Sequence, residues 1–128
     1  MAYRDDLAEG FIYCVDFVGR ARDELRVLPD NVADFFGRQL MVAQQGELPP
    51  KAVSAPNYGK NTYEIKFKCT GEEYRLLYRI STKIEVIGVL MAIDKKSSTG
   101  KDLSLKDKRT LLARQKEFDL FIKKNSYK

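Results

Sequence analysis

The 128-residue chain is predicted to form a single small α+β domain, in which a strand and a two-helix hairpin precede a mainly antiparallel sheet and a C-terminal helix. Three observations indicate this class. Apolar and polar residues alternate in the middle of the chain, apolar residues recur at helical spacing on either side of it, and proline and glycine separate these patterns. A chain of this length can bury about one modest core.

The N-terminal half is expected to supply the first strand and both hairpin helices. Residues 12–18 form a β-branched and aromatic run that Gly19 ends, which predicts a strand. Helical spacing follows as far as Pro29 and resumes after it to about Ala43, so two helices should lie over one face of the sheet. Residues 47–61 hold three prolines and are expected to form a connecting loop.

Residues 63–69 and 74–80 predict a hairpin, residues 84–93 a central strand and residues 104–123 the C-terminal helix. A turn at Gly71 and Glu72 would place Lys68 opposite Arg75 and Glu64 opposite Arg79. Two facing cations destabilise a sheet unless an anion lies between them, so this polar face favours a phosphate ligand. The alternative is a solvated face whose cations are neutralised by nearby glutamates.

Charge is distributed unevenly along the chain, whose net charge is +5. Residues 95–128 hold eleven Lys or Arg against four Asp or Glu, whereas residues 1–94 hold twelve against fourteen. Such a basic C-terminal part fits contact with a polyanion, and a solvated basic helix is the alternative. We therefore treat residues 101–128 as a basic helical extension of the domain.

The composition also limits the class of protein. The chain has no histidine and only two well-separated cysteines, so the usual zinc sites cannot be assembled, and we expect neither a metal nor a cofactor. No apolar run has the roughly 20 residues of a transmembrane helix. The acidic N-terminus is unlike a secretory signal. We expect a cytoplasmic protein.

Three segments carry a family resemblance: Y-E-I-K-F-K, E-Y-R-L-L-Y-R-I and V-I-G-V-L-M-A-I-D-K-K-S. With the order of elements, they resemble the RelE/HigB toxin superfamily, particularly its phage-derived HigB-like branch. The resemblance extends over about residues 13–114 and is most specific in residues 63–96. It implies the toxin of a type II toxin–antitoxin system, a ribosome-dependent mRNA endonuclease acting in the A site. A cognate antitoxin, expected to be a helix-turn-helix protein, would inhibit it.

The resemblance also implies which residues act. The expected catalytic residues are Lys66, Lys68, Arg75, Arg79 and Lys95. Arginine can hold two phosphate oxygens, whereas lysine can lose its proton when other cations crowd it, so the arginines suit charge stabilisation and Lys66 or Lys68 proton abstraction. The residues expected to bind RNA are Lys60, Lys96, Lys101, Lys106 and Arg109.

One departure from the family leaves alternatives open. Many relatives carry Tyr or His near the end of the last strand, but residues 91–94 here read Met-Ala-Ile-Asp, so the acid for the leaving group is unassigned. A second hypothesis is therefore a non-catalytic, phage-derived member of the fold that binds RNA or a host protein. A third is a DNA-binding module that uses the basic C-terminal helix.

Overall fold

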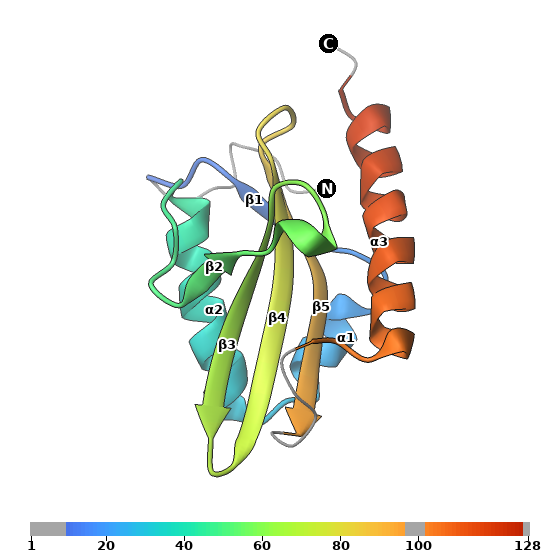
Figure 1. Ribbon diagram of the computed structural model, residues 1–128. Helices are drawn as coiled ribbons and strands as arrows, with labels where there is room; N and C mark the ends of the chain where they lie inside the picture. The colour runs from blue at the N-terminus through green and yellow to red at the C-terminus, as the bar shows by residue number, and fades with distance from the viewer. Residues whose placement is uncertain (1–9, 97–101, 127–128) are drawn as a thin grey trace.

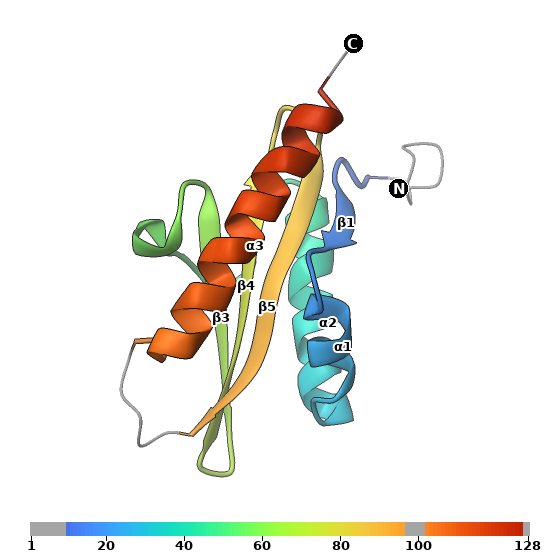
Figure 2. The same cartoon turned by 90° about the vertical axis from the view of Figure 1, so that its right-hand side faces the viewer.

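The computed structural model describes residues 10–96 and 102–126, and for residues 95 and 96 it describes the backbone only. Helices cover both faces of a central sheet, so the described part of the chain has three layers (Figures 1 and 2). The predicted α+β class is confirmed, with a strand, a helical hairpin, a mainly antiparallel sheet and a C-terminal helix in the expected order.

The sheet has five strands in the order β1-β5-β4-β3-β2. Its strands are β1 (Cys14–Phe17), β2 (Ala52–Ser54), β3 (Thr62–Cys69), β4 (Glu72–Ser81) and β5 (Val86–Lys96). Only β1 and β5 among them pair in parallel. Strand β5 lies between β1 and β4, which explains its continuous apolar run, because both faces of a central strand are buried.

Helices α1 (Ala21–Arg26) and α2 (Asp30–Gln44) pack together on one face of the sheet (Figure 2). The helical spacing of the sequence places Val32, Phe36 and Leu40 of α2 in one buried cluster with Ile65, Leu76 and other sheet residues. The alternation of β3 and β4 directs their other side chains to the opposite face. That second face carries the candidate site.

Helix α3 (Leu105–Lys124) covers part of the second face (Figure 2). Ser104 caps it by accepting a hydrogen bond from the Asp107 backbone at 3.1 Å, so the predicted start is confirmed. Leu111 and Phe118 pack in a second cluster with Leu77 and Leu90. The inner side of α3 is thus part of the core, and the helix is not solvated on all sides.

A bidentate ion pair fastens α3 to α1. The Arg114 guanidinium donates to both Glu24 oxygens, at 2.8 and 2.7 Å, and also to the Leu90 carbonyl at 2.9 Å. Arg114 is buried, and bidentate arginine–carboxylate pairs are among the stronger protein hydrogen bonds. The pair therefore fixes the position of α3 relative to the sheet.

The hairpin turn lies one residue earlier than predicted, at Thr70 and Gly71, whose φ angles are 48° and 80°. A two-residue hairpin with positive φ at both positions matches the strand twist, and Gly71 adopts this conformation without strain. The predicted register is consequently wrong by two residues. Arg75 lies opposite Lys66, Lys68 opposite Glu73 and Arg79 opposite Thr62, although every side chain stays on its predicted face.

The expected loop at residues 47–61 contains two short elements. Strand β2 pairs with β3 at the sheet edge, and the 3-10 helix η2 (Pro56–Tyr58) follows it. A three-residue strand has too little pattern to be recognised, and its pairing depends on a neighbour that comes later in the chain.

Helices long and apolar enough to cross a membrane are absent from the described residues.

Candidate nucleic-acid interface

The structure brings four predicted cations to one face of the β3–β4 hairpin. Side chains of Lys66 and Lys68 from β3 share this face with those of Arg75 and Arg79 from β4. We call these four residues the basic sheet face. All four thus lie on the predicted face of the hairpin, but each of them is close to a carboxylate.

Arg75 is a buried structural residue, not an open phosphate ligand. Its side chain is only 1% exposed, and it contacts Glu73 at 2.5 Å and Glu64 at 3.3 Å. Burial alone would raise the pKa of Glu73, but the hydrogen bond and charge of Arg75 outweigh it and hold that pKa below its usual value. In this arrangement Arg75 cannot reach RNA, so its expected catalytic role needs correction.

Arg79 lies beneath α3. Its guanidinium is 2.6 Å from an Asp119 oxygen, donates to Gln115 at 3.1 Å and stacks over the Phe118 ring at 5.4 Å. Its Nε is buried without a hydrogen-bond partner among the described residues. A phosphate could reach Arg79 only if α3 moved, so the predicted open cluster of four cations does not form here.

Lys66 and Lys68 remain accessible. The Lys66 side chain is 39% exposed and its Nζ is 3.9 Å from Glu64, while Lys68 is 77% exposed and 3.9 Å from Glu73. Their partners Glu64 and Glu73 are buried, but at 3.9 Å neither contact is close, so both ammonium groups remain able to meet a phosphate from solvent. The sequence analysis considered lysines surrounded by other cations. In the structure a carboxylate also lies beside each lysine.

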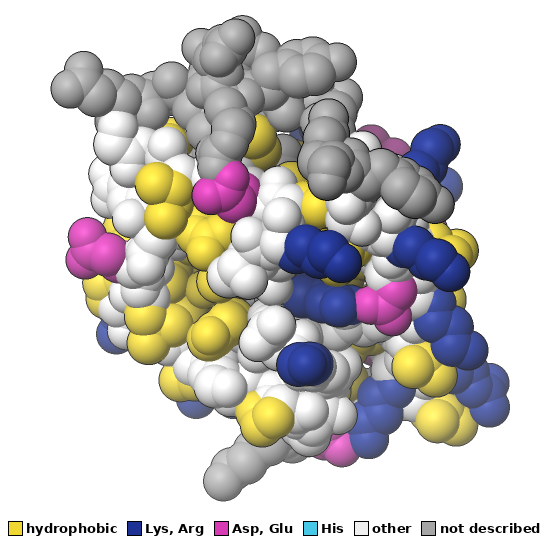
Figure 3. All heavy atoms as spheres, turned by 90° about the horizontal axis from the view of Figure 1, so that it is seen from above, with side chains coloured by type: hydrophobic (Ala, Val, Ile, Leu, Met, Phe, Trp, Pro, Cys, Tyr) yellow, Lys and Arg dark blue, Asp and Glu magenta, His cyan; other side chains and the backbone are white. Residues whose placement is uncertain are grey.

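The remaining predicted site residues are the catalytic candidate Lys95 and the five RNA-binding candidates, and they divide into three groups. Lys60, Lys106 and Arg109 are exposed, the first after η2 and the others on the first turns of α3. The backbone of Lys95 and Lys96 pairs with Glu73 and Glu72, but their side chains lie outside the described part. Lys101 also lies outside the described residues. Seen from above, Lys and Arg gather on the side of the molecule where α3 lies (Figure 3).

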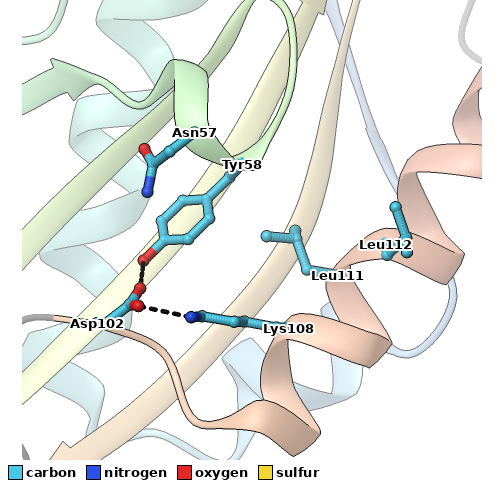
Figure 4. A pocket seen from close by; sticks show the side chains of 6 residues that line it. All are labelled: Asn57, Tyr58, Asp102, Lys108, Leu111 and Leu112. Carbon is cyan, nitrogen blue, oxygen red and sulfur yellow. Dashed lines mark hydrogen bonds and ion pairs between the residues drawn. The ribbon is translucent and has the colours of Figure 1, made fainter.

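A polar cluster between η2 and α3 was not predicted. The Tyr58 hydroxyl donates to one Asp102 oxygen at 2.9 Å, and Lys108 contacts the other at 2.5 Å (Figure 4). Gln115 further joins α3 to the loop by donating to the Tyr58 carbonyl and to Thr62. Tyr58 is 44 positions from Asp102 in the sequence, and the only available signal was an aromatic residue in a polar Asn-Tyr-Gly loop.

The cluster shifts the acidity of two groups. Hydrogen bonds from Lys108 and then Tyr58 hold the pKa of Asp102 at about 2, which keeps the carboxylate charged and able to accept further hydrogen bonds. Burial and the hydrogen bond to Asp102 raise the pKa of Tyr58 above its usual value. At neutral pH, therefore, Tyr58 is a neutral donor beside an anionic acceptor and a lysine.

The depressed pKa of Asp102 predicts a specific acid response. Since folding lowers this pKa from 3.8 to about 2, the interaction stabilises the fold fully above pH 3.8 and is lost as pH falls towards 2. We expect a carboxyl-carbon NMR titration to give a midpoint near 2 that rises towards 3.8 in Lys108→Met. An unchanged midpoint in that variant would contradict the assigned cause.

The described residues contain no group of three or more His, Cys, Asp or Glu that could hold a metal ion.

Comparison with known proteins identifies the family. The family model of phage-derived Gp49-like proteins matches residues 23–116, which is most of the chain and includes the basic sheet face. The chain belongs to the phage-derived Gp49-like family. A search among curated proteins gave no match to this Gp49-like chain.

Solved structures place the Gp49-like fold beside RelE. The isolated E. coli RelE toxin is 26% identical, with a TM-score of 0.53 over 68% of this chain and 88% of that chain. RelE in the intact E. coli RelBE toxin–antitoxin complex is 25% identical, with a TM-score of 0.51 over 72% of this chain and 99% of that chain. A free mutant of E. coli RelE is 20% identical, with a TM-score of 0.53 over 83% of this chain and 97% of that chain. At this identity the match supports the fold alone. The predicted assignment to the RelE superfamily is confirmed.

Proposed function

We propose that this chain is the toxin of a type II toxin–antitoxin system and that it cleaves mRNA at the ribosome. Membership of the Gp49-like family and similarity to the E. coli RelE toxin support the proposal. The observation that carries it is the pair of exposed lysines, Lys66 and Lys68, on the sheet face that α3 partly covers, with the further exposed cations Lys106 and Arg109 on the first turns of that helix. Single-stranded RNA binds such surfaces through its phosphates.

The structure supports a smaller set of phosphate ligands than the sequence predicted. Lys66 and Lys68 would hold the oxygens of one backbone phosphate, because both side chains reach solvent and their contacts with Glu64 and Glu73 are long, at 3.9 Å. Lys60, Lys106 and Arg109 would hold flanking phosphates. Arg75 would act indirectly, by positioning Glu64 and Glu73 and so setting where the two lysines lie.

The proposed reaction needs no metal. The 2′-hydroxyl of the RNA loses its proton as its oxygen attacks the adjacent phosphorus, the bond from phosphorus to the 5′-oxygen breaks, and the 5′-oxygen takes up a proton. The products are a 2′,3′-cyclic phosphate and a 5′-hydroxyl. Negative charge develops on the phosphate oxygens in the transition state. Lys66 and Lys68 would stabilise this charge, which is commonly the largest single contribution to such catalysis.

A partner protein is part of the proposal. The E. coli RelE toxin is found in a complex with its antitoxin, at 25% identity to this chain. We propose a cognate antitoxin for this chain as well, encoded beside it and carrying a helix-turn-helix domain. Co-purification of the neighbouring gene product with the tagged chain would test this.

A second candidate is a non-catalytic member of the fold that binds RNA or a host protein. The pairing of each cation of the basic sheet face with a carboxylate favours it, because a carboxylate stabilises the charged form of lysine and so opposes its use as a base. In this case the lysines would bind phosphate without cleaving the chain.

We expect the double variant Lys66→Ala/Lys68→Ala to relieve growth arrest when the chain is expressed in bacteria without an antitoxin. Removing two of the cations that stabilise the transition state should lower cleavage at least about a hundredfold, by analogy with the loss of one oxyanion donor. Primer extension on translated mRNA measures cleavage directly.

The matched control is Lys51→Ala/Lys83→Ala, which removes the same charge from exposed sites before β2 and between β4 and β5. This control should arrest growth like the unmodified chain. If the unmodified chain cuts no mRNA on translating ribosomes but still binds RNA, the second candidate is correct. Equal arrest by both double variants would exclude Lys66 and Lys68 as the site.

A further inference from the structure

A cavity of about 430 Å³ lies between η2 and the N-terminal half of α3 (Figure 4). It is lined by Asn57, Tyr58, Asp102, Lys108, Leu111 and Leu112. Its volume is within the range of about 300–1,000 Å³ that is typical of small-molecule sites. The proposed phosphate grip at Lys66 and Lys68 does not use any of these residues.

One side of this cavity, which we call the slot, is aromatic. Tyr58 of η2 lies on one side of it and Leu111 of α3 on the other, with Leu112 farther along α3 (Figure 4). Leu112 is 59% exposed, so an apolar side chain of the slot is left in contact with water. A flat, apolar ligand that stacks on the ring would cover both leucines.

The floor of the slot offers hydrogen bonds to the edge of such a ligand. One Asp102 oxygen accepts from the Tyr58 hydroxyl and the Leu103 amide, whereas the other accepts from Lys108 and retains a lone pair. Asn57 carries both a donor and an acceptor at the opening (Figure 4). An amino or ring N–H group of the ligand would meet Asp102, and a ring nitrogen or carbonyl would meet Asn57.

The slot is also joined to the basic sheet face. A second cavity of about 300 Å³ shares Asn57, Tyr58 and Asp102 with the first and reaches Glu64. The carboxylate of Glu64 is 3.9 Å from Lys66 Nζ. The second cavity thus extends from the slot to the carboxylate beside Lys66, and an RNA chain held at Lys66 would follow this path to place a neighbouring base in the slot.

We infer that the slot binds one unstacked purine base of single-stranded RNA, stacked on Tyr58 and recognised at its edge by Asp102 and Asn57. Proteins recognise single-stranded RNA in this way, by stacking bases on aromatic side chains and reading their hydrogen-bonding edges. A purine covers more of the aromatic wall and of the leucines than a pyrimidine does. The inference deepens the proposed function, on which it rests for the identity of the polymer.

Nucleoside monophosphates test the slot without ribosomes or cleavage. AMP, GMP, CMP and UMP would each be titrated into the ¹⁵N-labelled full chain, with inorganic phosphate as a separate titration. We expect the purine nucleotides to shift the amides of Asn57, Tyr58 and Leu112 at several-fold lower concentration than the pyrimidine nucleotides. Phosphate alone should leave these signals unchanged. No shift there with any nucleotide, or equal shifts with phosphate, would overturn the inference.

Variants separate stacking from edge recognition. Tyr58→Ala should weaken purine binding about tenfold or more, because stacking on an aromatic side chain contributes much of the affinity of a base. Tyr58→Phe keeps the ring and should retain most of it. Asp102→Asn should reduce the preference among bases, while Asp34→Asn, at an exposed site on α2, should have no effect. Equal binding by Tyr58→Ala and the unmodified chain would refute the stacking role.

The outcomes also separate this inference from the proposed function. Purine binding in the slot by a chain that cuts no mRNA would leave the inference standing and remove the nuclease. If Tyr58→Ala cleaves mRNA at the unmodified rate and with the same base preference, the nuclease function stands and the inference about the slot is overturned. If Tyr58 and Asp102 only fasten the loop to α3, their variants will lower stability and leave the nucleotide titrations unchanged.

Discussion

Arg75→Ala should lower the free energy of unfolding by about 3–5 kcal/mol, the range observed when one partner of a buried ion pair is removed. The Arg75 side chain is 1% exposed and lies between Glu73 at 2.5 Å and Glu64 at 3.3 Å. Its removal leaves two carboxylates in a largely buried position without their main cation. Desolvated charge without compensation is among the few mechanisms that produce losses of this size.

Urea unfolding at neutral pH measures the effect, and Lys66→Ala is the control. Lys66 lies directly opposite Arg75 but is 39% exposed, so its loss should cost less than about 1 kcal/mol. The deficit of Arg75→Ala should shrink as pH falls below the usual glutamate range, because a protonated Glu73 no longer needs a cation. A stability loss equal to that of Lys66→Ala would mean that Arg75 is not buried in solution.

This expectation changes how toxicity assays should be designed. A family resemblance invites the substitution of Arg75 as a catalytic residue, yet the loss of growth arrest in Arg75→Ala would reflect unfolding as well as any loss of phosphate contact. The lysine pair offers the cleaner test, since both side chains reach solvent and neither is part of the buried core.

Phe118→Ala should destabilise the protein by about 3–5 kcal/mol, as large-to-small substitutions of buried aromatic residues do. Phe118 is 1% exposed and packs on β5, where a Cβ atom at Gly88 would meet its ring at 2.6 Å. It also lies under the Arg79 guanidinium. The ring therefore holds α3 to the sheet, and its loss should loosen the cover over Arg79.

Hydrogen exchange of α3 amides, together with urea unfolding, measures this prediction. Leu120→Ala is the control, because Leu120 is 68% exposed on the same helix and its truncation should change stability by less than about 0.5 kcal/mol. Gly88→Ala should weaken α3 in the same direction as Phe118→Ala, since the added methyl group displaces the ring. Unchanged α3 exchange in Phe118→Ala would show that other contacts hold the helix.

The alternation of residues 63–80 predicted the two faces of the hairpin correctly even though the register was wrong. A shift of two residues returns each side chain to the same face, so the face assignment is insensitive to this error. The residue opposite each cation on the neighbouring strand, in contrast, changes with a register shift of two residues. Lys68 was expected opposite Arg75 and instead lies opposite Glu73.

The slot beside Tyr58 could not have been predicted from pattern. Its polar residues come from η2, from the segment before α3 and from α3 itself, and none of these stands in a periodic context with the others. They meet because Gln115 and the Arg114–Glu24 pair hold α3 in place against the loop and α1. Such contacts depend on packing and not on local spacing.

Short-range periodicity and composition were enough to predict the order of the longer strands and helices, the basic C-terminal part and the side of the hairpin on which its cations lie, but not β2 or η2. Which of those cations can meet a ligand depends on the folded arrangement. Arg75 is enclosed by Glu64 and Glu73 and Arg79 is covered by α3, whereas Lys66 and Lys68 stay open. Exposure and charge pairing arise from residues brought together by folding, which no local pattern records.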